Sequence, residues 1–401
     1  MVSPKTPKFN APRLPHNHPK PVALVLGQVF TPPSIVQRMV TLRRQNGEIL
    51  EPASGAGAFL QQLPPALTTS IEIDTNLATP PTLNLDFFDY PISHKFDTVI
   101  GNPPYVRHQD IAPDTLRKLN FDLFDKRSNL YLFFIAKALQ HLRPHGEMIF
   151  IVPRELLKAN SAAKLNQLLY DQGTITDYID LGDNPIFGAY APNCIIIRFE
   201  RNNFTRLTNG NLRFHCQNGQ LFFLSRNYPV QFNDLFFVKV GAVSGANKYF
   251  ISSHGNLDFV YSQTRKTGKT RRMFYNIEAP ELLPYRTALL ARHIKHFQPT
   301  EWYKWGRAHY VSDLPRIYVN YKTRNSNPFF MHPCPNYEGT ILAIFPKFPT
   351  IDLSLATHLL NQTNWSEIGF YCNGRYLFEP QALANTILPP EFAALLPKAN
   401  Q

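Results

Sequence analysis

The tetrapeptide Asn102-Pro103-Pro104-Tyr105 combines residue types and an order that suggest chemistry. It directly follows the β-rich run 96–101, so we expect it at the carboxyl end of a strand, where open α/β sheets bind ligands. The prolines restrict the backbone, and the side-chain oxygen of Asn102 and the carbonyl of Pro103 can together accept both hydrogens of a planar amino group. Tyr105 offers a ring on which a base can stack. The motif therefore predicts a site that holds a conjugated amine.

A glycine-bearing turn lies upstream, in the segment Glu51–Leu60 (EPASGAGAFL). It reads as a strand end, a turn and the start of a helix near Phe59. Glycines let the backbone approach a ligand closely, and a helix N-terminus favours an anionic group. A dinucleotide fingerprint would place a third glycine where Leu60 stands, so the segment disfavours NAD.

Two acidic positions follow at the ends of further expected strands. Glu72 can accept hydrogen bonds from both hydroxyls of a ribose. Asp86 can accept one from an adenine amino group, and the ring of Phe87 can cover the base. Together with the glycine turn, these residues predict a nucleoside-containing ligand.

Strand-like and helical patterns alternate over residues 22–200, which is typical of an α/β domain with a mostly parallel, doubly wound sheet. The expected elements are a helix after Thr31, strands at 48–50, 70–73, 96–100, 148–152 and 194–199, and helices at 129–142 and 154–170. Beyond about residue 200 the pattern becomes mixed, with strands expected at 221–224 and 317–321.

Charge separates the two halves of the chain. The 401 residues carry 41 Lys and Arg against 29 Asp and Glu, a net charge of +12. Residues 1–200 hold 19 basic and 18 acidic residues, which leaves 22 and 11, or +11, for residues 201–401. Such a balance favours a nucleic-acid partner, and segment 301–324 interleaves aromatic with basic residues. The candidate DNA contacts are Arg265, Lys266, Lys269, Arg271 and Arg272.

Several classes of protein are disfavoured. No apolar run approaches the ~20 residues of a membrane span, and the basic, Pro-rich N-terminus lacks the apolar core of a signal peptide. The four cysteines form no CxxC pair, so we expect neither a metal site nor a disulfide framework. We expect a cytoplasmic protein with no membrane partner.

In this order, the motifs resemble those of S-adenosylmethionine-dependent amino-methyltransferases, specifically the gamma-class, TaqI-like N6-adenine DNA methyltransferases. The resemblance covers residues 22–200 and includes Gly27–Pro33, Arg127–Tyr131 and Met148–Pro153. It departs at Ser54, where many relatives carry Cys. It implies cofactor binding by Thr31, Glu51, Pro52, Ala53, Ser54, Gly55, Gly57, Glu72, Asp86, Phe87 and Asn102, and catalysis by Asn102, Pro103, Pro104, Tyr105 and Phe187.

The family's mechanism would have an adenine flipped out of the duplex, held between Tyr105 and Phe187, and methylated by direct in-line attack. The resemblance implies a Rossmann-like class I methyltransferase domain at 22–230 after a flexible basic arm at 1–21. A mixed α+β target-recognition domain would follow at 231–401. The expected partner is double-stranded DNA with a specific adenine-containing site, bound by a monomer and paired with a separate cognate restriction endonuclease.

Two other functions share the Asn-Pro-Pro-Tyr core. They are methylation of an rRNA adenine and of a protein glutamine, but those enzymes generally lack a basic C-terminal domain of this size. A binding module that had lost its activity would show an eroded tetrapeptide or acidic residue, and both Asn102 and Glu72 are intact.

Overall fold

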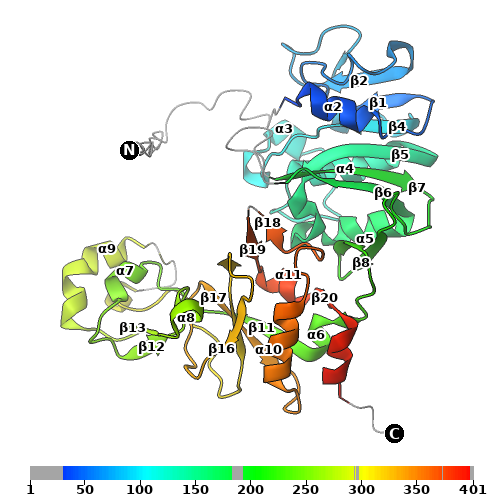
Figure 1. Ribbon diagram of the computed structural model, residues 1–401. Helices are drawn as coiled ribbons and strands as arrows, with labels where there is room; N and C mark the ends of the chain where they lie inside the picture. Colours follow the sequence, from blue (N-terminus) through cyan, green and yellow to red (C-terminus); the bar gives the residue numbers. More distant parts are fainter. Residues whose placement is uncertain (1–29, 183–192, 293, 295–297, 373, 398–401) are drawn as a thin grey trace, which may run out of the picture.

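The computed structural model describes residues 30–182, 193–292, 294, 298–372 and 374–397 (Figure 1). The predicted arm at 1–21 and the predicted aromatic residue Phe187 lie outside these residues. None of the helices in the described ranges is long and apolar enough to cross a membrane.

A seven-stranded sheet with the order β3-β2-β1-β4-β5-β7-β6 forms the N-terminal half. Its strands are β1 (Ile49–Glu51), β2 (Thr68–Glu72), β3 (Leu83–Asn84), β4 (Phe96–Gly101), β5 (Leu142–Pro153), β6 (Gly173–Asp180) and β7 (Cys194–Arg201). Strands β1 to β5 pair in parallel, whereas β7 runs antiparallel to both β5 and β6. The predicted mostly parallel, doubly wound sheet is confirmed.

Helices cover both faces of the sheet. Helix α2 (Pro33–Val40) buries its apolar side against Ile149 and Ile151 of β5, while α4 (Leu130–His141) packs in the core that contains Met148 and Phe150. Side chains of a strand point alternately to opposite faces, so the consecutive apolar residues 148–152 of β5 supply both layers.

Two expected helices differ in the structure. Residues 55–62 form turns rather than a helix after Phe59. The amide of Leu63 still bonds to the carbonyl of Phe59 at 3.1 Å, but Pro64 and Pro65 have no N–H to continue the pattern. The predicted anion-binding helix N-terminus is therefore wrong. Segment 154–170 begins as two short 3₁₀ turns, and the regular helix is α5 (Ala163–Gln172).

The C-terminal half is built on a four-stranded antiparallel sheet of order β11-β17-β14-β16. These strands are Phe236–Val240, Ile341–Pro346, Ile317–Asn320 and Phe329–Met331, in that order, and residues of α10 (Leu353–Gln362) and α11 (Pro380–Ala384) join the apolar core on one face. A smaller lobe carries the hairpin β12 (Leu257–Phe259) and β13 (Arg271–Met273) (Figure 1). This half is a mixed α+β unit, as the sequence predicted.

The aromatic residues of segment 301–324 are mostly structural. Trp302, Trp305 and Tyr318 are each at most 4% exposed and belong to apolar clusters of the C-terminal half. The interleaving of aromatic and basic residues there therefore reflects a packed core, and these three rings do not form a surface for stacking bases.

One hairpin is shared by the two halves. It consists of β8 (Arg213–Gln217) and β9 (Gln220–Leu224). Leu221 and Phe223 pack into the core of the N-terminal half, whereas Phe222 and Leu224 pack into that of the C-terminal half. The division at residue 230 remains a proposal, and this hairpin joins the two units on either side of it.

A buried ion pair connects β5 and β7. Glu147 is fully buried and Arg198 is 1% exposed, with 2.7 Å between Oε2 and Nε. The guanidinium also contacts Glu200, and it donates to the Thr176 hydroxyl at 2.6 Å. Glu147 accepts hydrogen bonds from the amides of Arg44 and Gln45 and from the hydroxyl of Thr98. The pair thus fixes the chain that leaves α2 against the sheet.

We predict that Arg198→Met lowers the free energy of unfolding by about 3–5 kcal/mol, because it leaves the Glu147 carboxylate buried without its counter-ion. Urea denaturation followed by far-ultraviolet circular dichroism measures this. Arg117→Met is the control, since its pair with Asp114 is exposed and should contribute little. Equal small effects of both substitutions would contradict the prediction.

Candidate functional site

The site lies where parallel strands end side by side. Strand β1 pairs with β2 through Ile49 and Thr68, and with β4 through Ile49 and Thr98. The carboxyl ends of these strands therefore meet at one edge of the sheet, with Glu51, Glu72 and Asn102 on neighbouring strand ends.

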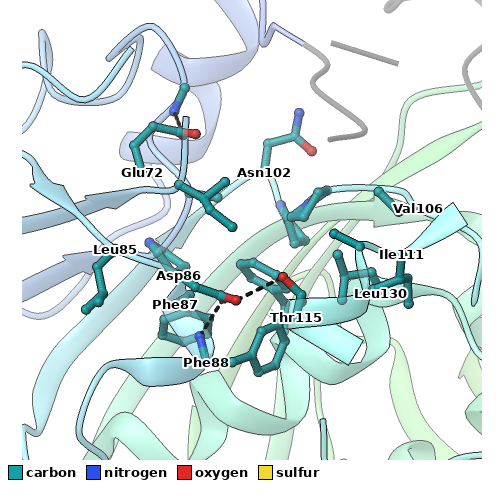
Figure 2. Close-up of a pocket in the computed structure, with 18 of the residues that line it drawn as sticks. Glu72, Leu85, Asp86, Phe87, Phe88, Asn102, Val106, Ile111, Thr115 and Leu130 are labelled. Atoms are coloured by element: carbon teal, nitrogen blue, oxygen red, sulfur yellow. Dashed lines mark hydrogen bonds between the residues drawn. The ribbon is translucent and has the colours of Figure 1, made fainter. Parts of the chain in front are cut away.

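A cavity with an empty volume of about 860 Å³, part of it open to solvent, opens at this edge (Figure 2). The sequence-predicted residues that line it are Pro52, Ala53, Gly55, Glu72, Asp86, Phe87, Asn102, Pro103 and Pro104. The tertiary structure thus brings the glycine turn, both acidic positions and most of the tetrapeptide to one cavity.

Glu72 is held by the backbone around it. One carboxylate oxygen accepts from the amide of Gly55 at 2.7 Å, and the other accepts from the amide of Asp74 at 2.8 Å. Gly55 has a φ of +54°, a left-handed conformation that glycine adopts without strain. The turn and the carboxylate consequently fix one another at the wall of the cavity.

Asp86 lines the cavity at the end of the neighbouring strand and is drawn below Glu72 in Figure 2. Its Oδ1 accepts from the amide of Phe88 at 3.0 Å, and its Oδ2 accepts from the hydroxyl of Thr115 at 2.9 Å. The ring of Phe87 is 2% exposed and packs against Phe134 with a centroid distance of 5.1 Å. Phe87 therefore forms part of the apolar floor between the cavity and the core.

The tetrapeptide divides between the cavity and the sheet. The side-chain nitrogen of Asn102 donates to the hydroxyl of Thr31 at 3.1 Å, which orients the amide. Tyr105 donates its hydroxyl to the carbonyl of Ile151 at 2.9 Å and meets Tyr131 edge to face. Burial, more than the nearby Cys194, raises the pKa of Tyr105 well above its usual range. Tyr105 thus lies beside the cavity rather than among its lining residues.

Among the ionisable groups of the site, the carboxyl group of Glu51 has the most unusual environment. It is fully buried, and neither carboxylate oxygen has a hydrogen-bond partner among the described residues. Burial, followed by the nearby charge of Glu72, raises the pKa of Glu51 well above its usual range. An unpartnered buried carboxyl group is costly, so this position suits a ligand that brings a hydrogen-bond donor or a positive charge.

The remaining predicted residues lie around the cavity without lining it. Thr31 is buried beneath Asn102, and Ser54 is buried within the turn. Gly57, with a φ of +78°, continues the turn. Phe187 is outside the described residues.

Sequence reasoning missed about half of the lining. Phe30, Ile73 and Phe88, like Leu85 and Val106, each adjoin a predicted site residue, and that adjacency was a usable signal. The other missed residues are Ile111, Ala112, Thr115, Leu130 and Phe134. Leu85 adjoins Asp86 and Val106 adjoins Tyr105, whereas Ile111, Ala112 and Thr115 come from a short irregular segment that carries no recognisable motif.

We predict that Glu51→Gln stabilises the ligand-free protein at neutral and alkaline pH. Because the pKa of Glu51 is higher in the folded than in the unfolded chain, the folded state binds more protons, and its stability falls as pH rises between those two values. Melting temperatures measured from pH 5 to 8 should show a growing advantage for the variant. Glu278→Gln, at an exposed position, is the control. If the difference in melting temperature between Glu51→Gln and the wild type stays constant across this range, the prediction is wrong.

The fold as a whole has a solved counterpart. A structure of the type IIL restriction-modification enzyme MmeI in complex with DNA aligns with 88% of this chain and 64% of that chain, with a TM-score of 0.58 and 12% sequence identity. This similarity concerns the fold alone. Together with the strand order, it defines a class I methyltransferase fold that is extended by a further C-terminal unit.

Comparison of amino-acid sequences identifies relatives more specifically than the fold does. Residues 65–187 match the family model of the Eco57I restriction-modification methylases. The chain is 31% identical over 185 residues to the type II methyltransferase M.HincII of Haemophilus influenzae, covering 43% of this chain and 37% of that protein. It is also 31% identical over 196 residues to M.TthHB8I of Thermus thermophilus, covering 44% and 45%. The matches thus span less than half the length of either relative.

Proposed function

We propose that the chain is a gamma-class, TaqI-like DNA methyltransferase that transfers a methyl group from S-adenosylmethionine to N6 of adenine in a specific sequence. The observation that carries the proposal is the position of Asn102-Pro103-Pro104 on the wall of the cavity that also contains Glu72 and Asp86. An acceptor for a substrate amine thereby adjoins acceptors for a nucleoside.

The arrangement of carboxyl groups fits S-adenosylmethionine. Glu72 would accept from the ribose hydroxyls and Asp86 from the adenine amino group. The cationic amino group of the methionine moiety would satisfy the buried carboxyl of Glu51, close to the backbone of Pro52, Ala53, Ser54 and Gly55. When bound, the cofactor supplies an electrophilic methyl group.

The protein's own contribution is to position and polarise the target amine. Thr31 engages the side-chain nitrogen of Asn102 and so turns the amide oxygen to the other side. That oxygen and the Pro103 carbonyl would accept the two hydrogens of the adenine amine. The same acceptors would stabilise the positive charge that develops on nitrogen during transfer. Tyr105 and Phe187 would stack on the flipped base.

Charge and relatives support DNA as the partner. Residues 201–401 carry the +11 excess, and the relatives include type II methyltransferases and an enzyme solved with DNA. The two relatives compared above, from Haemophilus influenzae and Thermus thermophilus, are bacterial, which supports action in a bacterial cytoplasm. A monomer on DNA and a separate cognate endonuclease remain parts of this proposal.

Within the candidate DNA surface, the structure distinguishes lysines from arginines. Lys266 and Lys269 are exposed, on and just after the short helix α8 (Thr264–Thr267). Arg265 donates to the carbonyl of Asn327 at 2.9 Å.

The two arginines of β13 already have acidic partners. Arg271 pairs with Glu338 at 3.4 Å and Arg272 with Asp258 at 2.8 Å. We therefore expect the lysines to contribute more to phosphate binding than the arginines.

We predict that Asn102→Ala lowers methyl transfer by about a hundredfold to a thousandfold, because it removes an acceptor that acts on the reacting amine. Binding of S-adenosylhomocysteine should persist, as calorimetry can show. The readout is the map of modified adenines on the DNA of a methylation-deficient host that expresses each form.

The exposed Asn120→Ala serves as the matched control for that experiment. Near-normal modification by Asn102→Ala would contradict the assigned role. Unmodified DNA from the wild-type strain, with methylated rRNA or protein instead, would favour one of the two alternative substrates.

We further predict that Lys266→Ala/Lys269→Ala weakens DNA binding and lowers the slope of log K against log salt by about two, since two phosphate contacts would be lost. Fluorescence anisotropy at several salt concentrations measures this slope. Lys126→Ala/Lys164→Ala removes the same charge from exposed positions of the N-terminal half and should change the slope less. Equal changes of the slope in the two double variants would mean that net charge, and not the position of the lysines, determines the salt dependence of DNA binding.

A further inference from the structure

A short segment between β4 and α4 closes one wall of the cavity. It contains the helical turn α3 (Pro113–Leu116), and Ile111, Ala112 and Thr115 all line the cavity. Thr115 is 7% exposed, and Figure 2 shows its hydroxyl pointing to Asp86.

Three donors surround the carboxylate of Asp86, whose side chain is 9% exposed. The amide of Phe88 donates to Oδ1 at 3.0 Å. The hydroxyl of Thr115 and the ammonium of Lys118 donate to Oδ2 at 2.9 and 3.1 Å. Lys118 also contacts Asp89, so this lysine links two carboxylates at the rim.

These contacts limit the further hydrogen bonds that the Asp86 carboxylate can accept. An ionised carboxylate has about four acceptor positions and no donor. Three positions are filled, two of them on Oδ2, so the open position belongs to Oδ1. Because Asp86 lines the cavity, an occupant that reaches this position must bring a donor. A 6-amino purine offers an N–H donor at C6, whereas a 6-oxo purine offers an acceptor at C6 and carries its donor at N1 instead.

We propose that Thr115 and Lys118 are positioning residues that hold the Asp86 carboxylate, so that the cavity selects a 6-amino purine over a 6-oxo purine. The inference rests on the proposed function, because it takes the purine to be that of the cofactor. It adds to that function two residues outside every motif of the sequence.

The two side chains contribute in different ways. Thr115 fixes the rotation of the carboxylate through a neutral hydrogen bond from a buried position. Lys118 supplies a positive charge, and its hydrogen bond to Asp89, followed by its interaction with Asp86, raises its pKa. Lys118 thus holds Oδ2 with a charged donor, and Thr115 holds the same oxygen with a neutral one.

The test compares two ligands rather than one activity. Calorimetry gives the dissociation constants of S-adenosylhomocysteine and of its deaminated analogue, S-inosylhomocysteine. The wild-type protein should prefer the adenine form by about tenfold to a hundredfold, the value of a hydrogen bond to a charged group. Thr115→Val and Lys118→Met should each lower this ratio by about threefold to tenfold.

The controls separate positioning from packing. Thr115→Ser keeps the hydroxyl and should restore the preference. Arg117→Met removes a neighbouring exposed charge that pairs with Asp114 and should leave the ratio unchanged. Asp86→Asn offers a donor and should abolish the preference. Circular dichroism checks folding, and Thr115→Ala replaces the valine variant if that one does not fold.

The outcomes are distinguishable. If Thr115→Val and Lys118→Met weaken both ligands equally while Asp86→Asn abolishes the preference, the positioning role is wrong and the assignment of Asp86 stands. If Asp86→Asn also leaves the ratio unchanged, the purine does not lie at Asp86, and this part of the proposed function fails.

Discussion

The buried ion pair between Glu147 and Arg198 links the framework of the sheet to the site. It joins β5 to the antiparallel β7, and the same glutamate accepts backbone hydrogen bonds from Arg44 and Gln45. Those two residues follow helix α2, which starts at Pro33, two residues after Thr31. Thr31 in turn holds the amide of Asn102. A charge pair inside the sheet therefore helps to place the helix that orients the candidate catalytic side chain.

The electrostatics of the cavity follow from its place at the ends of parallel strands. Glu51 and Glu72 end neighbouring strands, yet their environments differ. Backbone amides hold Glu72, whereas Glu51 is buried without such partners and its pKa is raised. Two carboxyl groups in one low-dielectric site favour a ligand that carries both hydroxyl donors and a positive charge.

The C-terminal half combines a packed core with a basic surface. Its tryptophans and Tyr318 lie in apolar clusters, so the aromatic content of this half serves folding. Its basic side chains are not equally free to contact phosphates. Arg271 and Arg272 have acidic partners, whereas Lys266 and Lys269 are exposed. The hairpin of β8 and β9 belongs to both cores and gives the two halves a shared apolar contact.

The sequence alone determined the strands that end in Glu51, Glu72 and Gly101, the helices after Thr31 and Asn129, and the separation of charge, because these features are local in the chain. It failed at residues 55–62, where a helical pattern meets two prolines, and it gave no sign that the hydroxyl of Tyr105 bonds to the carbonyl of Ile151 in β5. Only the tertiary structure decided that Thr115 and Lys118 reach Asp86 and that Glu147 meets Arg198. Such contacts join residues far apart in the chain through strand register and loop path, which no local pattern encodes.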